Sequence, residues 1–460
     1  MLRADRSLPA GLRSAFVGRG RVVFVLMLGF LGGAFHTAAA LVSDMPIEEV
    51  ISDVTINRDR LLERIERLAA YGGTSDGGVH RVAFSREDIR SRDYLREIMR
   101  EAGLETTVDA AGNLIGRRGG SGGDLPVILL GSHTDTVPHG GKYDGALGVL
   151  AAVECVQCLK ERGIATRHPV EVVVFTDEEG GLIGSRALAG TMTEEALDIV
   201  THSGLRVGEG IRALGGDPDS LPGAVRRPGD IQAYLELHIE QGGVLESRSL
   251  EIGVVAGIVG IQHWNVTVEG AANHAGTTPM DERRDALLGA AQFVLAVNRI
   301  VREEPGTQVG TVGRIKAEPG APNVIPGRVT MSLEIRDLSG TKIDALFSRI
   351  NQEAAGISER TGTRISFDDV DDEAAPALTD TRLQRIISES SEELGLTHQV
   401  MPSGAGHDAQ EIARIAPIGM VFVPSVGGIS HSPREYTKDK DVVNGAAVLF
   451  QALLRIDRTF

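Results

Sequence analysis

The sequence has very few cysteines. Only two of its 460 residues are cysteine, Cys155 and Cys158. A disulfide framework is therefore excluded, and a chain of this length has a core large enough to fold without one. The two cysteines are three residues apart in an expected helix and so share one helical face, which favours packed thiols over the alternative of a disulfide.

Basic residues are also scarce. The chain has 47 Lys and Arg against 63 Asp and Glu, for a formal net charge of -16. This balance excludes nucleic acid as a partner, because phosphate binding relies on clustered Lys and Arg. With 42% hydrophobic and 24% charged residues, the chain is neither disordered nor a polytopic membrane protein. Its length exceeds one ordinary core and predicts two domains.

Long apolar runs are absent except near the amino terminus. There, five arginines precede an uncharged stretch that ends in Ala38, Ala39 and Ala40. This pattern is typical of a secretory signal over residues 1–40, so we expect an exported protein, periplasmic or secreted. The alternatives are an uncleaved segment that anchors the protein to a membrane, and a misassigned start codon that leaves it in the cytoplasm.

Residues 127–162 predict a buried strand, a polar loop and a long helix. The loop carries His133, Asp135 and Asp144. Loops at the carboxyl ends of parallel strands converge on a crevice, and imidazole and carboxylate groups suit zinc or a similar divalent ion. The alternative is that these side chains only cap a turn.

A second buried strand, Val170–Phe175, leads into Asp177, Glu178 and Glu179. In an extended chain, adjacent side chains point to opposite sides. We therefore expect one glutamate to bind a metal while its neighbour accepts a proton.

Two more strands end in candidate ligands. Alternation over residues 234–242 places Glu236, His238 and Glu240 on one face of a strand. His431 follows the apolar strand Ile418–Val423, as His133 follows its own strand.

The organisation changes over residues 257–369. Four strands are expected there, at 263–269, 308–317, 328–336 and 363–367, with helices at 281–303 and 343–361. The order βαββαβ is the ferredoxin-like arrangement, which folds as a unit of its own. Helices are also expected at 46–70, 86–103 and 380–394. We therefore predict an α/β fold in which a mixed-sheet catalytic domain, residues 41–256 and 370–460, is interrupted by an inserted α+β domain.

Five motifs resemble one family of enzymes. They are Gly131-Ser-His-Thr-Asp-Thr-Val-Pro, Gly141-Lys-Tyr-Asp-Gly-Ala-Leu-Gly-Val-Leu, Glu236-Leu-His-Ile-Glu-Gln-Gly, Asn273-His-Ala-Gly-Thr-Thr-Pro-Met and Gly404-Ala-Gly-His-Asp-Ala. The family is the hydantoinase/carbamoylase branch of the zinc aminoacylase and carboxypeptidase-type metallohydrolases. Its members include N-carbamoyl-L-amino-acid hydrolases, allantoate amidohydrolases and ureidoglycolate amidohydrolases. The resemblance covers nearly everything after residue 45.

The resemblance implies two divalent metal ions, Zn²⁺ in the first place with Mn²⁺, Co²⁺ or Ni²⁺ as alternatives. Asp144 would bridge the ions, with His133 and His238 on one and Glu179 and His431 on the other. Asp135 would orient His133, because a ligating imidazole needs its other nitrogen held.

The resemblance also implies catalytic and substrate-binding roles. Glu178 would be the general base, and His274 would polarise the scissile carbonyl, usually across the interface of a homodimer formed by the inserted lid domain. Asn323 and Arg336 would contact substrate; for Arg336 the alternative is an ion pair with Asp337 or Glu334. Further candidates for substrate contact are Gln241, Gly404 and Ala405.

We thus expect a metal-dependent amidohydrolase that cleaves the ureido C–N bond of a small N-carbamoyl amino acid or a related ureide. The alternatives are a peptidase or acylase acting on an ordinary amide, and a metal-binding scaffold without activity. The segment after Glu179 is shorter than in many relatives, which leaves the choice of substrate open.

Overall fold

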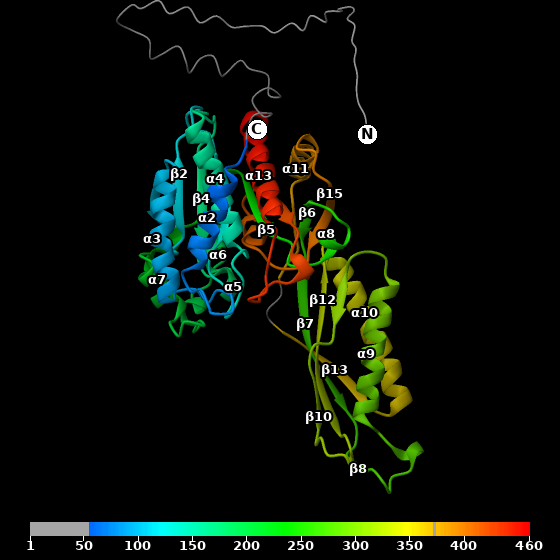
Figure 1. Ribbon diagram of the computed structural model, residues 1–460. Coiled ribbons are helices and arrows are strands. Elements are labelled where there is room, and N and C mark those ends of the chain that lie inside the picture. The colour runs from blue at the N-terminus through cyan, green and yellow to red at the C-terminus, as the bar shows by residue number, and fades with distance from the viewer. Residues whose placement is uncertain (1–54, 371–373) are drawn as a thin grey trace, which may run out of the picture. The chain divides into compact units, whose positions relative to one another are not determined.

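The computed structural model describes residues 55–370 and 374–460, which form two main sheets (Figure 1). The two sheets pack in separate hydrophobic cores. The predicted signal segment, residues 1–40, and the first part of the predicted helix 46–70 lie outside the described residues. Among the residues described, no helix is long and apolar enough to span a membrane.

The larger sheet has nine strands in the order β1-β2-β4-β3-β5-β16-β6-β14, with β15 paired to β6. Its strands are β1 (Glu105–Val108), β2 (Leu114–Arg118), β3 (Val127–His133), β4 (Val170–Phe175), β5 (Ile231–Ile239), β6 (Ile252–Ile258), β14 (Ala377–Leu378), β15 (His398–Ser403) and β16 (Ile418–Val423). The sheet is mixed, as predicted, and its central strands β4, β3, β5 and β16 are parallel.

The central strands end level with one another. His133 pairs with Phe175, and Val423 pairs with Ile239. Strands β3, β4 and β16 are buried along their whole length, which is why their sequences are nearly continuous apolar runs. Because these strands are parallel, the loops that follow them meet at one edge of the sheet.

Helices cover both faces of this sheet. One core, on one face, includes residues of α2 (Arg58–Ala69), α3 (Arg86–Glu101), α4 (Ala146–Glu161), α11 (Thr381–Glu393) and α13 (Asp439–Thr459). A second core, on the other face, includes residues of α6 (Ile183–Ala189), α8 (Val244–Ser247) and α12 (Asp408–Ile412). Cys155 and Cys158 on α4 are free thiols packed in the first core.

The second sheet is antiparallel, in the order β10-β12-β7-β13, with β9 paired to β12. Its strands are β7 (Gly260–Glu269), β9 (Val309–Thr311), β10 (Ile315–Glu318), β12 (Arg328–Asp337) and β13 (Arg364–Asp369). Helices α9 (Ala286–Glu303) and α10 (Gly340–Thr361) pack on this sheet (Figure 1). In the core between them Trp264 stacks on Phe347, with ring centroids 4.2 Å apart. The element order of this sheet and its helices is the predicted βαββαβ when β9 and β10 are counted as one strand. A separate two-stranded ribbon joins β8 (Asn273–His274) to β11 (Val324–Ile325).

Several boundaries differ from the prediction. Helix α9 begins at Ala286 and not at residue 281, because Asp285 caps it by accepting the backbone N–H groups of Leu287 and Leu288. The predicted strand 308–317 is divided into β9 and β10. Strands β6 and β15 and the helix α7 (Val207–Ala213) were not predicted.

Candidate active site

The five predicted metal ligands lie at the carboxyl edge of the larger sheet. His133 ends β3, His238 lies near the end of β5, and Asp144 precedes the helix α4. Glu179 lies in α5 (Glu178–Gly181), directly after β4, and His431 lies in the loop after β16. The strand ends thus deliver ligands from segments that are far apart in the sequence.

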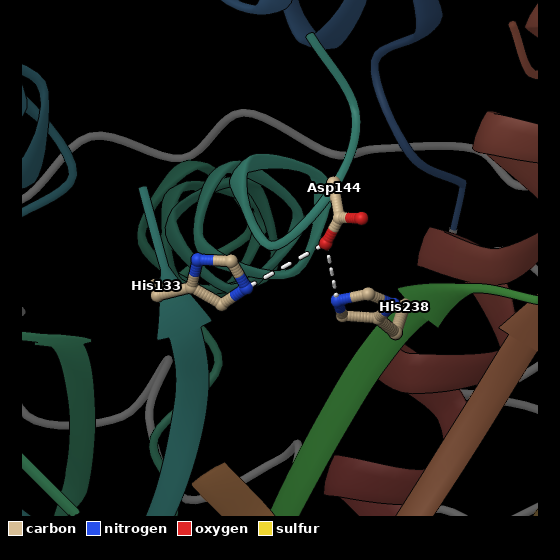
Figure 2. Close-up of side chains that lie close together, drawn as sticks. All are labelled: His133, Asp144 and His238. Atoms are coloured by element: carbon tan, nitrogen blue, oxygen red, sulfur yellow. Dashed lines mark ion pairs between the residues drawn. The ribbon is translucent and has the colours of Figure 1, made fainter. Parts of the chain in front are cut away.

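Asp144 lies between two imidazoles (Figure 2). Its Oδ1 atom is 3.1 Å from Nε2 of His238 and 3.6 Å from Nε2 of His133. All three side chains are buried, and one ligand atom from each lies within 4.8 Å of the others. This group of nitrogen and oxygen donors has the composition of a site for a divalent metal ion.

The other oxygen of Asp144 faces a second group. Oδ2 is 3.5 Å from Nε2 of His431, and this nitrogen is 3.6 Å from Oε2 of Glu179. The ligand atoms of Asp144, Glu179 and His431 also lie within 4.8 Å of one another. Asp144 is therefore shared by two groups, which contain the same residues as the two ion sites that the family resemblance implies.

A glycine makes room for this arrangement. Gly145 follows Asp144 with φ of 61°, and a Cβ atom added there would overlap the imidazole ring of His133. A side chain at this position would be disfavoured both by the left-handed backbone and by the ring. The turn into α4 and the place of His133 therefore depend on each other.

The two glutamates diverge for a reason other than the predicted one. Residues 178–181 form a single helical turn and not an extended segment. Asp177 starts this turn in the left-handed conformation, with φ of 53°. As a result Oε2 of Glu178 lies 3.6 Å from Nε2 of His133, while Glu179 faces His431.

Backbone carbonyls orient the two buried histidines. Nδ1 of His133 lies 3.0 Å from the carbonyl oxygen of Asp135, and Nδ1 of His238 lies 2.9 Å from that of Ile239. The Nε2 atoms are thereby turned toward Asp144. Asp135 thus holds His133 through its main chain, while its carboxylate accepts the N–H groups of Glu178, at 3.4 Å, and Glu179, at 3.2 Å.

The cluster has an excess of acidic groups. Burial, and then the charge of Glu179, raise the pKa of Glu178 well above its usual range. Burial and the charge of Asp144 raise the pKa of Glu179 to about 9. Burial alone would raise the pKa of Asp144, but His238 and His133 outweigh it and hold that pKa below its usual range. Bound cations would relieve the repulsion among these carboxylates, so the donor set fits divalent metal ions.

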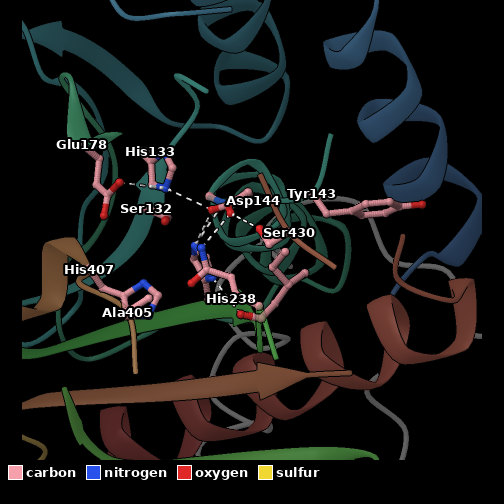
Figure 3. Close-up of polar contacts among 12 residues, drawn as sticks. Ser132, His133, Tyr143, Asp144, Glu178, His238, Ala405, His407 and Ser430 are labelled. Carbon is pink, nitrogen blue, oxygen red and sulfur yellow. Dashed lines mark hydrogen bonds and ion pairs between the residues drawn. The ribbon is translucent and has the colours of Figure 1, made fainter. Parts of the chain in front are cut away.

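A third group of possible ligands is engaged elsewhere. Glu236, His238 and His407 are close enough to hold an ion. However, Glu236 accepts hydrogen bonds from Ser132 at 2.6 Å and Tyr234 at 3.0 Å, and Nε2 of His407 lies 2.8 Å from the Ser403 hydroxyl. Figure 3 shows Ser132 and His407 beside the ligands. Because Glu236 and His407 are engaged in these hydrogen bonds, we expect them to support the structure of the site and not to bind an ion.

A cavity of about 270 Å³ opens onto the ligands. Its lining consists of Asp144, Glu178, Glu179, Leu182, His238, Gln241, Arg336, Ala405, Gly406, His407 and His431. Gln241 donates to Oδ2 of Asp144 at 2.8 Å, and its Oε1 atom is buried without a hydrogen-bond partner among the described residues. The predicted substrate contacts Gln241, Arg336 and Ala405 thus line one cavity with four of the five predicted ligands, and Gly404 precedes Ala405 in the chain.

Arg336 also makes the ion pair that was the alternative to a substrate role. Its Nε and Nη2 atoms donate to Glu334 at 2.7 and 3.1 Å, and Nη1 donates to the carbonyl oxygen of Gly404 at 2.8 Å. Three of the five N–H groups of the guanidinium are used in this way, and two remain. Arg336 is therefore both held in place and able to bind another group.

His274 and Asn323 lie apart from this cavity. They are neighbours on the β8–β11 ribbon, where Ala275 donates to the carbonyl oxygen of Asn323 at 3.0 Å. Both side chains are exposed, and neither belongs to the described residues that line the cavity.

Sequence reasoning missed two residues of the site, Ser430 and Glu435. The Ser430 hydroxyl donates to Oδ2 of Asp144 at 2.7 Å, and Oε1 of Glu435 accepts the backbone N–H of Asp144 at 3.1 Å. Their only sequence signal is proximity to His431, because the loop that they contact is almost 300 residues away.

The fold and the grouped ligands define a class of metallohydrolase. The family described as Peptidase family M20/M25/M40 matches residues 129–455, and the chain belongs to this family. The predicted kinship is thereby confirmed.

Individual relatives are similar over nearly their whole length. An N-carbamoyl-L-amino acid amidohydrolase from Geobacillus stearothermophilus is 44% identical to this chain. The match covers 87% of this chain and 99% of the length of the relative. An allantoate amidohydrolase from Bacillus subtilis is 37% identical over 87% of this chain and 98% of its own. A solved amidase of the hydantoinase/carbamoylase family from Burkholderia multivorans has a TM-score of 0.83 and 36% identity, covering 88% of this chain and 98% of its own.

These relatives correct the prediction of an exported protein. The two bacterial amidohydrolases are matched over 99% and 98% of their own length by 87% of this chain, so they have no counterpart of a forty-residue secretory signal. The prediction of export, which rested on residues 1–40 alone, is therefore wrong.

Proposed function

We propose that this protein is a dinuclear metal-dependent amidohydrolase that cleaves the ureido C–N bond of an N-carbamoyl-L-amino acid or a related ureide. The observation that carries the proposal is the Asp144 carboxylate shared by two groups of ligands, with Glu178 beside one of them. The likeness to amidohydrolases that are 37% and 44% identical supports the choice of bond.

His133, Asp144 and His238 would hold one divalent ion, and Asp144, Glu179 and His431 would hold the other. Imidazole and carboxylate ligands suit Zn²⁺ first, and also Mn²⁺, Co²⁺ or Ni²⁺. When bound, such ions act as Lewis acids that polarise a carbonyl group and lower the pKa of water.

Glu178 is the general base. Its Oε2 atom lies 3.6 Å from Nε2 of His133, so its carboxylate reaches the region between the ligands and the cavity. There it accepts a proton from the attacking water and returns that proton to the leaving nitrogen. Only 10% of its side chain is exposed, so bulk water has little access to this transfer.

Arg336 and Gln241 bind the rest of the substrate. The two free N–H groups of Arg336 form a fork for the substrate carboxylate. Gln241 lines the same cavity and contacts the ureido group of the substrate. Ala405 lines this cavity as well, and the carbonyl oxygen of the preceding Gly404 holds Arg336.

A screen of ammonia release tests the proposed reaction. The metal-loaded protein is supplied with N-carbamoyl-L-amino acids, allantoate, ureidoglycolate and, for comparison, dipeptides and N-acetyl amino acids. We expect ammonia from one or more of the ureides and little cleavage of the ordinary amides. Peptide or acyl cleavage without ureide cleavage would replace this proposal with a peptidase or acylase.

The segment 257–369 forms the inserted lid and dimerisation domain of a homodimer. Four large apolar side chains are exposed on and just before α9, namely Met280, Leu287, Leu288 and Leu295. Exposed apolar side chains concentrated in one segment favour a protein partner, and a second copy of the same chain is the partner that we propose. His274 and Asn323, which lie apart from the cavity of their own chain, then serve the site of the other subunit.

Complementation between two inactive variants tests this arrangement. His274→Ala should lower turnover by about 10²- to 10³-fold, the usual effect of losing a donor to a developing oxyanion, with metal content unchanged. His274→Ala and Glu178→Gln proteins are then mixed under conditions in which subunits exchange. If His274 acts across the interface, a mixed dimer has one site with neither lesion, and activity returns. No recovery despite demonstrated exchange would place His274 in the site of its own subunit.

A further inference from the structure

Glu435 is a buried carboxylate that none of the roles above uses. It follows His431 by four residues, in the loop that leads into α13, and is 5% exposed. Its Oε1 atom accepts the backbone N–H groups of Tyr143, at 2.9 Å, and Asp144, at 3.1 Å. The side chain therefore joins the loop of His431 to the loop of Asp144.

The other carboxylate oxygen of Glu435 lies beside Ser430. Oε2 lies 2.9 Å from the Ser430 hydroxyl, and this hydroxyl lies 2.7 Å from Oδ2 of Asp144. Figure 3 shows Ser430 beside the Asp144 carboxylate. Asp144 is thus held twice, at its backbone by Glu435 and at its side chain by Ser430.

The neighbouring sequence is shaped to admit Glu435. A Cβ atom added to Gly141 would overlap the Glu435 carboxyl group, so glycine at this position leaves the space that the side chain fills. The rings of Tyr143 and Tyr436 also meet edge to face, with centroids 6.1 Å apart. The two loops are therefore complementary in shape as well as in hydrogen bonding.

We propose that Glu435 is a positioning residue that fixes Asp144 between the two groups of metal ligands. This inference rests on the proposed function, in which Asp144 is the ligand shared by both ions. Without an acceptor, the buried N–H groups of Tyr143 and Asp144 would have to seek other partners, and the loop would move. Both carboxylate oxygens of Asp144 would then be displaced from their positions near His238 and His431.

Binding of Co²⁺ measures this role without reference to activity. Apo-protein is titrated with Co²⁺, the visible absorption spectrum is recorded, and affinity is determined by competition with a chelator. Glu435→Ala should weaken metal binding by about 10- to 100-fold, the usual effect of removing a partner that orients a ligand, and should change the spectrum.

Two further variants separate positioning from general damage. Glu435→Gln keeps an oxygen for the two N–H groups and offers an amide donor to Ser430, so it should bind within about 3-fold of the unaltered protein. Glu411→Ala is the matched control, since Glu411 is also a buried carboxylate but bonds to Thr191 and Arg414. It should leave Co²⁺ affinity and spectrum unchanged.

The variant Gly141→Ala displaces the Glu435 side chain without removing it. This variant replaces Glu435→Ala in the test if the Glu435→Ala protein does not fold. It should reproduce the loss of affinity, and combining it with Glu435→Ala should add little, because both changes remove the same contact. Gly119→Ala is its control, since a Cβ atom there meets nothing within 4 Å.

Three results would overturn the inference: unchanged Co²⁺ binding by Glu435→Ala or Gly141→Ala, additive losses in the double variant, or an equal loss in Glu435→Gln. Failure of the unaltered protein to bind Co²⁺ would instead contradict the proposed function.

Discussion

Replacing Arg336 with lysine separates the substrate-binding role of this residue from its ion pair with Glu334. Arginine has five N–H groups, and three of them already bond to Glu334 and to the Gly404 carbonyl. The remaining two form the fork proposed for the substrate carboxylate. Lysine keeps the charge and the ion pair with Glu334 but reaches the substrate through a single point of contact.

The expected cost of Arg336→Lys follows from this count of donors. One hydrogen bond to a charged group is lost, worth about 1.5–3 kcal/mol. At about 1.4 kcal/mol for each factor of ten, KM should rise by about 10- to 150-fold. Turnover should change little, because a carboxylate fork acts on the bound substrate and on the transition state alike.

The assay compares an N-carbamoyl amino acid with its carboxamide, in which the carboxylate is replaced by a neutral amide. We expect Arg336→Lys to impair kcat/KM for the acid and to leave it nearly unchanged for the carboxamide. Arg314→Lys, which alters a hydrogen bond to Asn265 on the same sheet, is the matched control and should affect neither substrate. An unchanged KM for the acid, or an equal loss on both substrates, would refute the reasoning.

Three further predictions concern the metals, the base and the thiols. Chelation should abolish activity, and Zn²⁺, Mn²⁺ or Co²⁺ should restore it, because these ligands discriminate little among the three ions; activity in protein shown by elemental analysis to be metal-free would contradict this. Glu178→Gln should keep its metals but lose turnover by about 10²-fold or more, and full activity at full metal content would assign the base elsewhere. Burial raises the pKa of Cys158 to about 11 and that of Cys155 well above its usual range, so thiolate is scarce at pH 8. A thiol reagent should therefore modify neither cysteine until the protein is unfolded, when both should react; rapid labelling of the native protein would disprove their burial.

The parts of the site that the sequence predicted are those set by local pattern. Apolar strands that end in or are followed by a candidate ligand, as with His133, Glu179 and His431, can be predicted from short segments, because strand burial and the following loop are local properties. The sequence could not show which histidine meets which carboxylate oxygen of Asp144, because that depends on the order of strands in the sheet. The grouping of His133 with His238 was inherited from the family resemblance, and it needs β3 and β5 to be neighbours.

Other features were missed because they depend on distant contacts or on single backbone angles. Nothing near Glu435 indicates that its carboxylate will meet the N–H of Asp144, which is almost 300 residues earlier in the chain. The helical turn at Glu178 depends on Asp177 adopting a left-handed conformation, which is rare for a residue other than glycine. Strand β6 was not predicted because glycines interrupt its apolar pattern, so its sequence resembles that of a loop.

The order of the larger sheet has a consequence for how the chain folds. Strand β16 is the last strand in the sequence, yet it lies between β5 and β6, which end about 180 and 160 residues before it begins. Until β16 arrives, β5 and β6 each keep an unpaired edge, and such edges invite pairing with other chains. Contacts this distant in sequence form slowly, so folding intermediates should be exposed to aggregation. The loop that follows β16 contains His431. The last strand of the sheet and the last metal ligand are therefore added in the same step of folding.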